Sequence, residues 1–232
     1  MTRDQVRRRL EFHRDLGVKT VYRRACATPV AQEPQTQPEG CATETLEKIR
    51  ADIGDCTRCP LHQGRNKIVF GVGNEQTKLV FVGEGPGADE DEQGIPFVGR
   101  AGQLLTQMIE NTAKKEGIPL LRRDVYICNV VKCRPPGNRT PEPGEMEICG
   151  QFLFRQLAAI NPKAICVLGG TAMRALLGST DGVTRLRGQW HRWRDIPVMV
   201  TYHPSYLLRP YNPDAKREAW EDLKKVLHYV YD

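Results

Sequence analysis

The feature of the sequence that most constrains the fold is a set of four short, almost uninterrupted apolar runs. They occupy residues 78–84, 125–133, 164–170 and 198–203. Apolar runs of this length are typical of strands that are buried on both faces, as in a parallel sheet. We therefore expect a mainly parallel, four-stranded sheet.

Helical patterns separate these runs. The predicted helices are residues 101–117, a segment capped by Thr140 that runs to about Ile160, residues 171–177, and a C-terminal segment capped by Asp214. Pro141 would occupy the first position of the second helix, where proline is well tolerated. Because strands alternate with helices, the fold class is predicted to be α/β, a three-layer α/β/α sandwich around the sheet.

The chain is expected to divide at about residue 43. Residues 1–42 are predicted to be an N-terminal helix and a flexible linker, because residues 27–42 hold three prolines, three glutamines and no periodicity. Residues 43–232 form the predicted main domain. Residues 1–24 carry a net charge of +5, whereas residues 43–232 carry only +3. Nucleic-acid binding by the main domain would therefore need a local basic patch.

The sequence shows neither a membrane-spanning pattern nor the pattern of a secretory signal peptide. No run approaches about eighteen consecutive apolar residues, and the N-terminus lacks the apolar core of a signal peptide. We expect a cytoplasmic protein with no membrane partner, in which disulfides are disfavoured. Its eight cysteines need another explanation. Cys128 and Cys166 lie inside apolar runs and are predicted to be core residues.

Four other cysteines have the spacing of a metal site. Cys56 and Cys59 form a Cys-x2-Cys pair, Cys133 follows the second apolar run, and Cys149 lies on the predicted second helix. Four thiolates can hold either zinc or an iron–sulfur cluster, and spacing does not choose between them. Four unrelated thiols are the remaining alternative.

Glycine and polar side chains follow each apolar run. They are found at residues 83–87, at Asn129 with residues 132–136, at residues 169–171 and at residues 203–209. Ligands of open parallel sheets bind beyond the carboxyl ends of the strands. One such motif alone would favour an ordinary turn, since glycine and proline commonly end strands. Four together favour a binding site at one edge of the sheet.

Three sequence blocks resemble the signatures of family-4 uracil-DNA glycosylases. They are GEGPGADEDEQGIPFVGRAGQLL (83–105), NVVKCRPPGNRTPEP (129–143) and HPSYLLR (203–209). The resemblance covers roughly residues 43–232 and includes the four-cysteine pattern. It implies a [4Fe-4S] cluster rather than zinc. It also implies a DNA-repair enzyme of the nucleoid that removes uracil from single- and double-stranded DNA without cutting the backbone.

The resemblance assigns a pocket for uracil that has been flipped out of the base stack. Phe97 would stack on the base. Asn129 would accept from uracil N3–H and donate to O4, and His203 would donate to O2, where negative charge develops. Considered singly, each residue also has an ordinary structural explanation. Phe97 would be a core aromatic, Asn129 would make a hydrogen bond at the end of a strand, and His203 would be a hydrogen-bonded polar residue.

The carboxylate that positions water has two candidates. Glu84 is preferred for uracil contact or water positioning, and Glu90 is the alternative base. In the distant founding glycosylases an aspartate aligns with Gly85, where family-4 enzymes usually have alanine. Most of residues 89–92 would otherwise be a solvated loop. Gly85 and Gly87 are expected to let backbone amides approach the base or phosphates closely.

DNA contacts are predicted from two segments. Residues 184–194 carry four arginines and no acid, so that Arg185 and Arg187 are candidates for phosphate binding, although a solvated hairpin is an equal alternative. The second segment would insert an apolar wedge into the minor groove. Its candidate residues are Tyr206, Leu207, Leu208 and Arg209.

Two other functions fit the same scaffold. One is a non-catalytic DNA-binding module, with residues 1–42 as a tether to replication or repair proteins. The other is a relative that traps uracil-DNA through a histidine on a long basic loop after the second strand. Residues 134–144 contain no histidine, which argues against trapping.

Overall fold

The structure is a computed structural model that describes residues 44–209 and 213–232. The helix and linker predicted within residues 1–42 lie outside these described residues. The apolar runs form the central strands: β2 (Leu79–Gly83), β3 (Tyr126–Asn129), β4 (Ala164–Leu168) and β6 (Ile196–Thr201). These four strands are parallel, in the order β3-β2-β4-β6. Every residue of β2, β3 and β4 is buried, as predicted for strands covered on both faces.

The sheet in the described part of the chain has six strands, not the predicted four. The short β1 (Val72–Gly73) pairs antiparallel with β3, and β5 (Trp190–Trp193) pairs antiparallel with β6. Both added strands lie at edges and have exposed or half-exposed side chains. They therefore lack the continuous apolar run that reveals a buried strand in the sequence.

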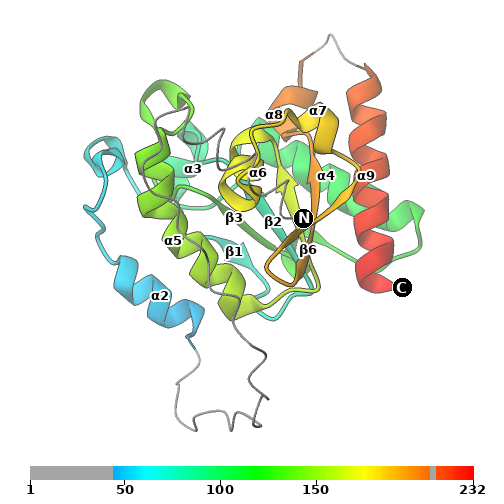
Figure 1. Ribbon diagram of the computed structural model, residues 1–232, viewed down its shortest axis with the longest axis horizontal. Helices are drawn as coiled ribbons and strands as arrows, with labels where there is room; N and C mark the ends of the chain where they lie inside the picture. The colour runs from blue at the N-terminus through cyan, green and yellow to red at the C-terminus, as the bar shows by residue number, and fades with distance from the viewer. Residues whose placement is uncertain (1–43, 210–212) are drawn as a thin grey trace, which may run out of the picture. The chain divides into compact units, whose positions relative to one another are not determined.

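Helices cover both faces of the sheet, which confirms the three-layer α/β/α class (Figure 1). α2 (Leu46–Ile53), α5 (Pro143–Ile160) and α6 (Gly170–Leu177) pack on one face, against alternate strand residues such as Val80 and Val82. α4 (Arg100–Lys115) and α9 (Pro213–Tyr231) pack on the other face, against Leu79 and Phe81. The alternation of side chains along each strand thus supplies two separate cores.

Short helical segments connect these layers. They are η1 (Pro60–Gly64), α3 (Ala88–Gln93), η2 (Arg122–Asp124), η3 (Pro136–Asn138), α7 (Val183–Leu186) and α8 (Pro204–Leu207). α5 begins at Pro143 and not after Thr140, because the Glu145 carboxylate accepts the Glu142 N–H at 2.7 Å and so caps the helix there. Arg139 pairs with the same carboxylate at 2.6 Å, which holds the preceding turn.

Two predictions about apolar character can be checked directly. Cys128 and Cys166 are fully buried, so their assignment to the core is confirmed. Within residues 44–209 and 213–232, no helix combines the length and apolar character needed to span a bilayer.

Candidate active site

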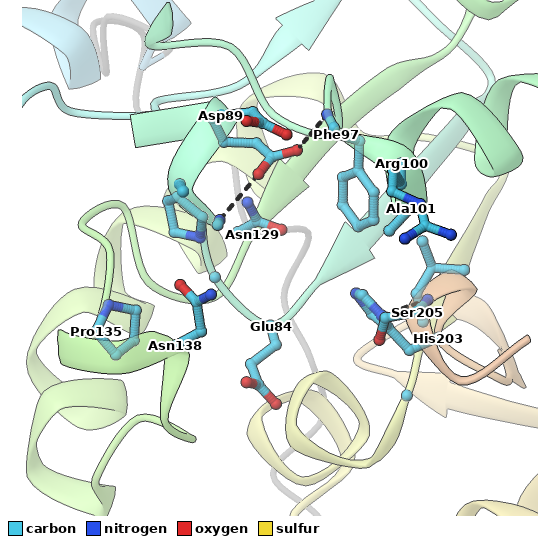
Figure 2. Close-up of a pocket in the computed structure, with 18 of the residues that line it drawn as sticks. Glu84, Asp89, Phe97, Arg100, Ala101, Asn129, Pro135, Asn138, His203 and Ser205 are labelled. Atoms are coloured by element: carbon cyan, nitrogen blue, oxygen red, sulfur yellow. Dashed lines mark hydrogen bonds between the residues drawn. The ribbon is translucent and has the colours of Figure 1, made fainter. Parts of the chain in front are cut away.

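A cavity of about 470 Å³ opens beyond the carboxyl ends of the parallel strands. The loops after β2, β3, β4 and β6 all contribute to its lining, together with α3 and the start of α4. Figure 2 shows Phe97, Asn129 and His203 around one space, with Glu84 below them. The convergence predicted for the strand ends is thus confirmed, because parallel strands bring their carboxyl ends to a single edge.

Asn129 is the last residue of β3 and is almost fully buried, with 1% of its surface exposed. Its side-chain oxygen, Oδ1, is buried and has no hydrogen-bond partner in the structure. Leaving such an acceptor unpaired costs about 1–3 kcal/mol. A donor from a bound ligand would remove that cost, so the cavity is prepared for a ligand with an N–H or O–H group.

Gly83 allows the amide and the aromatic ring to approach the strand end. A Cβ atom at this position would lie 2.5 Å from both Asn129 Oδ1 and Phe97 Cζ. Any other residue would therefore push these two side chains out of place.

Phe97 is held in an unusual backbone conformation, with φ of +55°. Its ring lies 5.6 Å from the His203 ring, centroid to centroid, at an interplanar angle of 36°. Gly102 makes this possible, because a Cβ atom there would lie 1.9 Å from the Phe97 carbonyl oxygen. Strain of this kind, of the order of 1–3 kcal/mol, is concentrated at ligand-binding positions.

Glu90 organises the loops on this side of the cavity. Its Oε1 accepts from the Val98 N–H at 2.8 Å and the Gly99 N–H at 2.9 Å, and Oε2 accepts from the Gly87 N–H at 3.0 Å. Both oxygens are therefore engaged in joining α3 to the turn that carries Phe97. Because both oxygens already accept hydrogen bonds, Glu90 suits a structural role in holding these loops better than the role of a general base.

The acidic run at residues 89–92 forms part of α3 and is not a solvated loop. Asp89 and Glu92 are exposed, but Asp91 is 1% exposed. The Asp91 carboxylate accepts from the backbone N–H and the side-chain amide of Asn66, at 2.9 and 2.7 Å. This pairing, which a sequence pattern does not reveal, explains why Asp91 is buried.

Glu84 has a carboxylate that is free to act on a ligand. It lines the cavity, is half-buried, and its side chain makes no hydrogen bond or ion pair with another described residue. Figure 2 shows its side chain extending away from Phe97 and Asn129.

His203 caps α8 and presents a defined nitrogen to the cavity. Its Nδ1 accepts from the Ser205 backbone N–H at 3.2 Å and lies 2.7 Å from the Ser205 hydroxyl. Burial lowers the pKa of His203 to about 4, so the ring is neutral near pH 7. Since Nδ1 is the acceptor, the proton of the neutral ring lies on Nε2.

Gly169 is required beside this histidine for two reasons. Its φ is +89°, and a Cβ atom there would lie 2.9 Å from His203 Cβ. The loop after β4 therefore packs directly against the residue that follows β6.

Several lining residues were not singled out as site residues in the sequence. Arg100, Asn138 and Ser205 are among them. Asn138 has a φ of +57°, and its Oδ1 accepts from Arg134 Nε at 2.8 Å. The signal that was available is the Pro-Gly-Asn turn, because asparagine adopts positive φ more readily than most residues.

The structure corrects the prediction that Arg187 binds phosphate. Its guanidinium pairs with the fully buried Asp222 carboxylate at 2.7 Å and donates to the Glu218 carbonyl at 2.8 Å. Arg187 therefore stabilises the packing of α9. Arg185 is exposed and pairs only with the exposed Asp181, at 3.1 Å, so that it remains available to a polyanion.

The predicted wedge is also corrected in part. Leu207 is 2% exposed and packs with Ala215 and Ala219 of α9, because the turn of α8 directs it inward. Leu208 is 39% exposed, and Arg209 is exposed as well. The Tyr206 ring stacks on Tyr202, with centroids 5.2 Å apart. These contacts leave Leu208 as the exposed apolar side chain of this segment.

The four cysteines of the predicted metal site do not line this cavity. Cys59, Cys133 and Cys149 are buried, and Cys56 is half-buried. Burial raises the pKa of the Cys59, Cys133 and Cys149 thiols, to about 12 for Cys149, and neighbouring cysteines of the group raise it further. The thiols thus lie close enough to affect one another's ionisation.

Hydrogen-bond donors face two of these sulfur atoms. Arg65 Nη1 donates to Cys133 Sγ at 3.4 Å, and the Lys132 backbone N–H donates to Cys149 Sγ at 3.2 Å. Such donors favour thiolates over thiols. In the described residues, no group of three or more His, Cys, Asp or Glu side chains is arranged to hold a single metal ion.

The fold and the cavity place the chain in the class of open-sheet α/β proteins, whose ligands bind at the carboxyl edge. The sequence profile of the Uracil DNA glycosylase superfamily matches residues 70–224. A type-4 uracil-DNA glycosylase of Thermotoga maritima is 46% identical over 189 residues, which is 81% of this chain and 95% of that protein. The type-4 uracil-DNA glycosylase of Archaeoglobus fulgidus is 44% identical over 191 residues, 79% of this chain and 92% of that protein.

A more distant relative is the type-5 uracil-DNA glycosylase of Pyrobaculum aerophilum, 34% identical over 120 residues, half of each chain. The chain belongs to the uracil DNA glycosylase superfamily and, within it, to the type-4 uracil-DNA glycosylases. The resemblance stated from the sequence blocks is thereby confirmed.

Proposed function

We propose that this protein flips uracil out of DNA and hydrolyses its N-glycosidic bond, leaving an abasic site, as the first step of base excision repair. The observation that carries the proposal is the unpaired, buried Oδ1 of Asn129 in the cavity that His203 and Phe97 also line. The family to which the chain belongs supports the same function.

Asn129 would select uracil over cytosine. Its Oδ1 accepts from uracil N3–H, and its Nδ2 donates to uracil O4. Cytosine has an acceptor at N3 and a donor at its exocyclic amine, so both hydrogen bonds would be lost. Phe97 would stack on the face of the base and exclude water from it.

His203 would stabilise the leaving group. Cleavage of the C1′–N1 bond leaves uracil as an anion with charge on O2, and a neutral ring that carries its proton on Nε2 donates to that oxygen. Such a donor is preorganised, because Ser205 already fixes the other nitrogen.

Glu84 would position the water that attacks C1′ or oppose the positive charge on the sugar. In Glu84→Gln, we expect excision to slow by about 10-fold or more, with no change in thermal stability, since the side chain has no partner to lose. Glu90→Gln should instead lower the melting temperature, because an amide N–H would face a backbone N–H. Single-turnover rates and thermal unfolding of both variants test this. A rate loss confined to Glu90→Gln would assign the base to Glu90.

The rate of uracil excision should fall at acid pH with a midpoint near pH 4 and not near 6.5. The pKa of His203 in the folded protein, about 4, is below its unfolded value, so the neutral donor persists down to that pH. For the same reason, proton uptake by the unfolded chain should reduce stability as pH falls from about 6.5 toward 4. Single-turnover rates between pH 4 and 8 test the first statement, and a midpoint near 6.5 that vanishes in His203→Gln would contradict it.

We also propose that Cys56, Cys59, Cys133 and Cys149 hold a [4Fe-4S] cluster. The donor set suits this group, because it has four thiols and N–H donors to two of the sulfurs. When bound, the cluster would cross-link the segment between α2 and η1, the loop after β3, and α5. Glycosidic hydrolysis transfers no electrons, so its contribution is to structure.

The purified protein is therefore expected to be brown and to contain iron and acid-labile sulfide. Cys149→Ser should lose the colour and about 10 °C or more of melting temperature, which corresponds to several kcal/mol for a chain of this size. Cys166→Ser is the matched control, since Cys166 is also buried but lies in the core. A colourless protein with one zinc ion would contradict the cluster.

Residues around the cavity would bind the DNA. Leu208 would fill the gap that the flipped base leaves, while Arg185 and Arg209 would contact phosphates. Residues 43–232 would suffice for this work. Residues 1–42 would act as a separate tether to replication or repair proteins, which would keep the enzyme in the cytoplasm near the nucleoid.

One assay tests the function. The protein is incubated with a uracil-containing oligonucleotide, single- or double-stranded, and then with alkali. We expect strand breaks at the former uracil position, and only once the protein-treated DNA has been exposed to alkali. An SDS-stable adduct would indicate covalent trapping, and neither product would indicate a non-catalytic binding module.

A further inference from the structure

Lys132 is an unusual residue for a protein interior. It has 1% of its surface exposed and follows Asn129 by three positions. Its ammonium nitrogen donates to the Asn129 carbonyl oxygen at 2.8 Å and to Gln156 Oε1 at 2.6 Å. Both acceptors are neutral, and no carboxylate of the described residues forms an ion pair with it. A buried lysine without an acidic partner is costly, so its retention calls for a role.

The same residue also reaches the four-cysteine group through its backbone. Its N–H donates to Cys149 Sγ at 3.2 Å, and its carbonyl accepts from the Val69 N–H at 2.8 Å. Lys132 therefore contacts the proposed uracil-binding residue on one side and a proposed cluster ligand on the other.

The position of Asn129 explains why such support matters. β3 ends at Asn129, and the next backbone N–H groups, of Val130 and Val131, bond to the carbonyls of Gly83 and Glu84. The Asn129 carbonyl is held by the Lys132 side chain. The direction of the Asn129 amide depends on its backbone, so rotation of this peptide would move Oδ1 within the cavity.

We propose that Lys132 is a positioning residue that holds Asn129 in its base-binding orientation and links the uracil pocket to the four-cysteine site. The inference rests on the proposed function. It distinguishes Lys132 from a residue that only stabilises the fold, because positioning of Asn129 affects uracil binding in the folded protein.

The test compares Lys132→Met with Tyr126→Phe in the cluster-loaded protein. Tyr126 is the matched control, because its hydroxyl accepts from Gln156 Nε2 at 3.3 Å at the far end of the same buried network. The readouts are inhibition by free uracil, kcat and KM on a uracil oligonucleotide, and iron content. We expect Lys132→Met to weaken uracil inhibition and to lower kcat by about 10-fold each, with KM and iron content near wild type. Tyr126→Phe should bind uracil as the wild type does.

Each other outcome overturns the inference. Wild-type uracil inhibition in folded Lys132→Met would show that Asn129 needs no such support. An equal loss in Tyr126→Phe would show a general effect of the buried network. If Lys132→Met does not fold, Gln156→Met replaces it, with an expected loss of about 3-fold and with unchanged uracil inhibition as the contradicting result. An inactive wild type would instead sink the proposed function, and the inference with it.

Discussion

His203→Ala should lower kcat for uracil excision by about 100- to 1,000-fold, which is the usual effect of removing one preorganised donor to a developing oxyanion. The Nε2–H of the neutral ring contacts uracil O2 most strongly when the glycosidic bond is breaking. The loss should therefore fall on kcat, and KM should change little. Single-turnover rates on single- and double-stranded uracil oligonucleotides measure it.

Ser205→Ala is the matched control for this experiment. The Ser205 hydroxyl lies 2.7 Å from His203 Nδ1, but its backbone N–H also donates to that nitrogen and remains in the variant. The ring therefore keeps its tautomer, and the rate should fall by less than about 5-fold. A His203→Ala rate within about threefold of wild type would remove the imidazole from the chemistry.

Asn129→Ala should reduce kcat/KM for uracil by about 100-fold. Two hydrogen bonds to the base would be lost, each of about 1.5 kcal/mol in a buried site. The same change should leave the melting temperature unchanged or raise it, because Oδ1 has no hydrogen-bond partner among the described residues. Kinetics on uracil oligonucleotides and thermal unfolding of the same samples test the two effects together.

Asn138→Ala provides the comparison within the same cavity. Asn138 also lines it, but its Oδ1 already accepts from Arg134. We expect its rate to stay within about 5-fold of wild type. Equal losses in both variants would mean that the cavity wall as a whole, and not the Asn129 amide, recognises the base. A large fall in melting temperature for Asn129→Ala would contradict the view that its amide is kept for a ligand.

These experiments also probe how a glycosylase without an aspartate at Gly85 carries out its reaction. Both carboxylate oxygens of Glu90, the alternative base, accept hydrogen bonds, from three backbone N–H groups in all. Its work is to hold the turn of Phe97, whose strained φ needs support from its surroundings. The Glu84 side chain makes no such hydrogen bonds with the described residues, and it lines the cavity, so a bound substrate would contact its carboxylate.

The sequence alone determined the four parallel strands of the sheet and the edge at which the candidate pocket lies. Continuous apolar runs can be read as buried strands because burial on both faces leaves a local pattern, and parallel strands must bring their ends to one edge. Asn129 and His203 could therefore be assigned to one cavity before any coordinates were known. The Cys56-x2-Cys59 pair is a local signal of metal binding, and the full set of four cysteines stays a prediction.

Tertiary structure decided what depends on distant partners. The edge strands β1 and β5, the pairing of Arg187 with Asp222 and the burial of Leu207 all arise from neighbours far along the chain. The tautomer of His203 depends on the lowered pKa that burial produces, together with one backbone N–H. The roles of Glu90 and Lys132 follow from hydrogen bonds that leave no periodic trace in a sequence. Local patterns record which face of an element is buried, whereas the partner of a polar group is set only when the chain has folded.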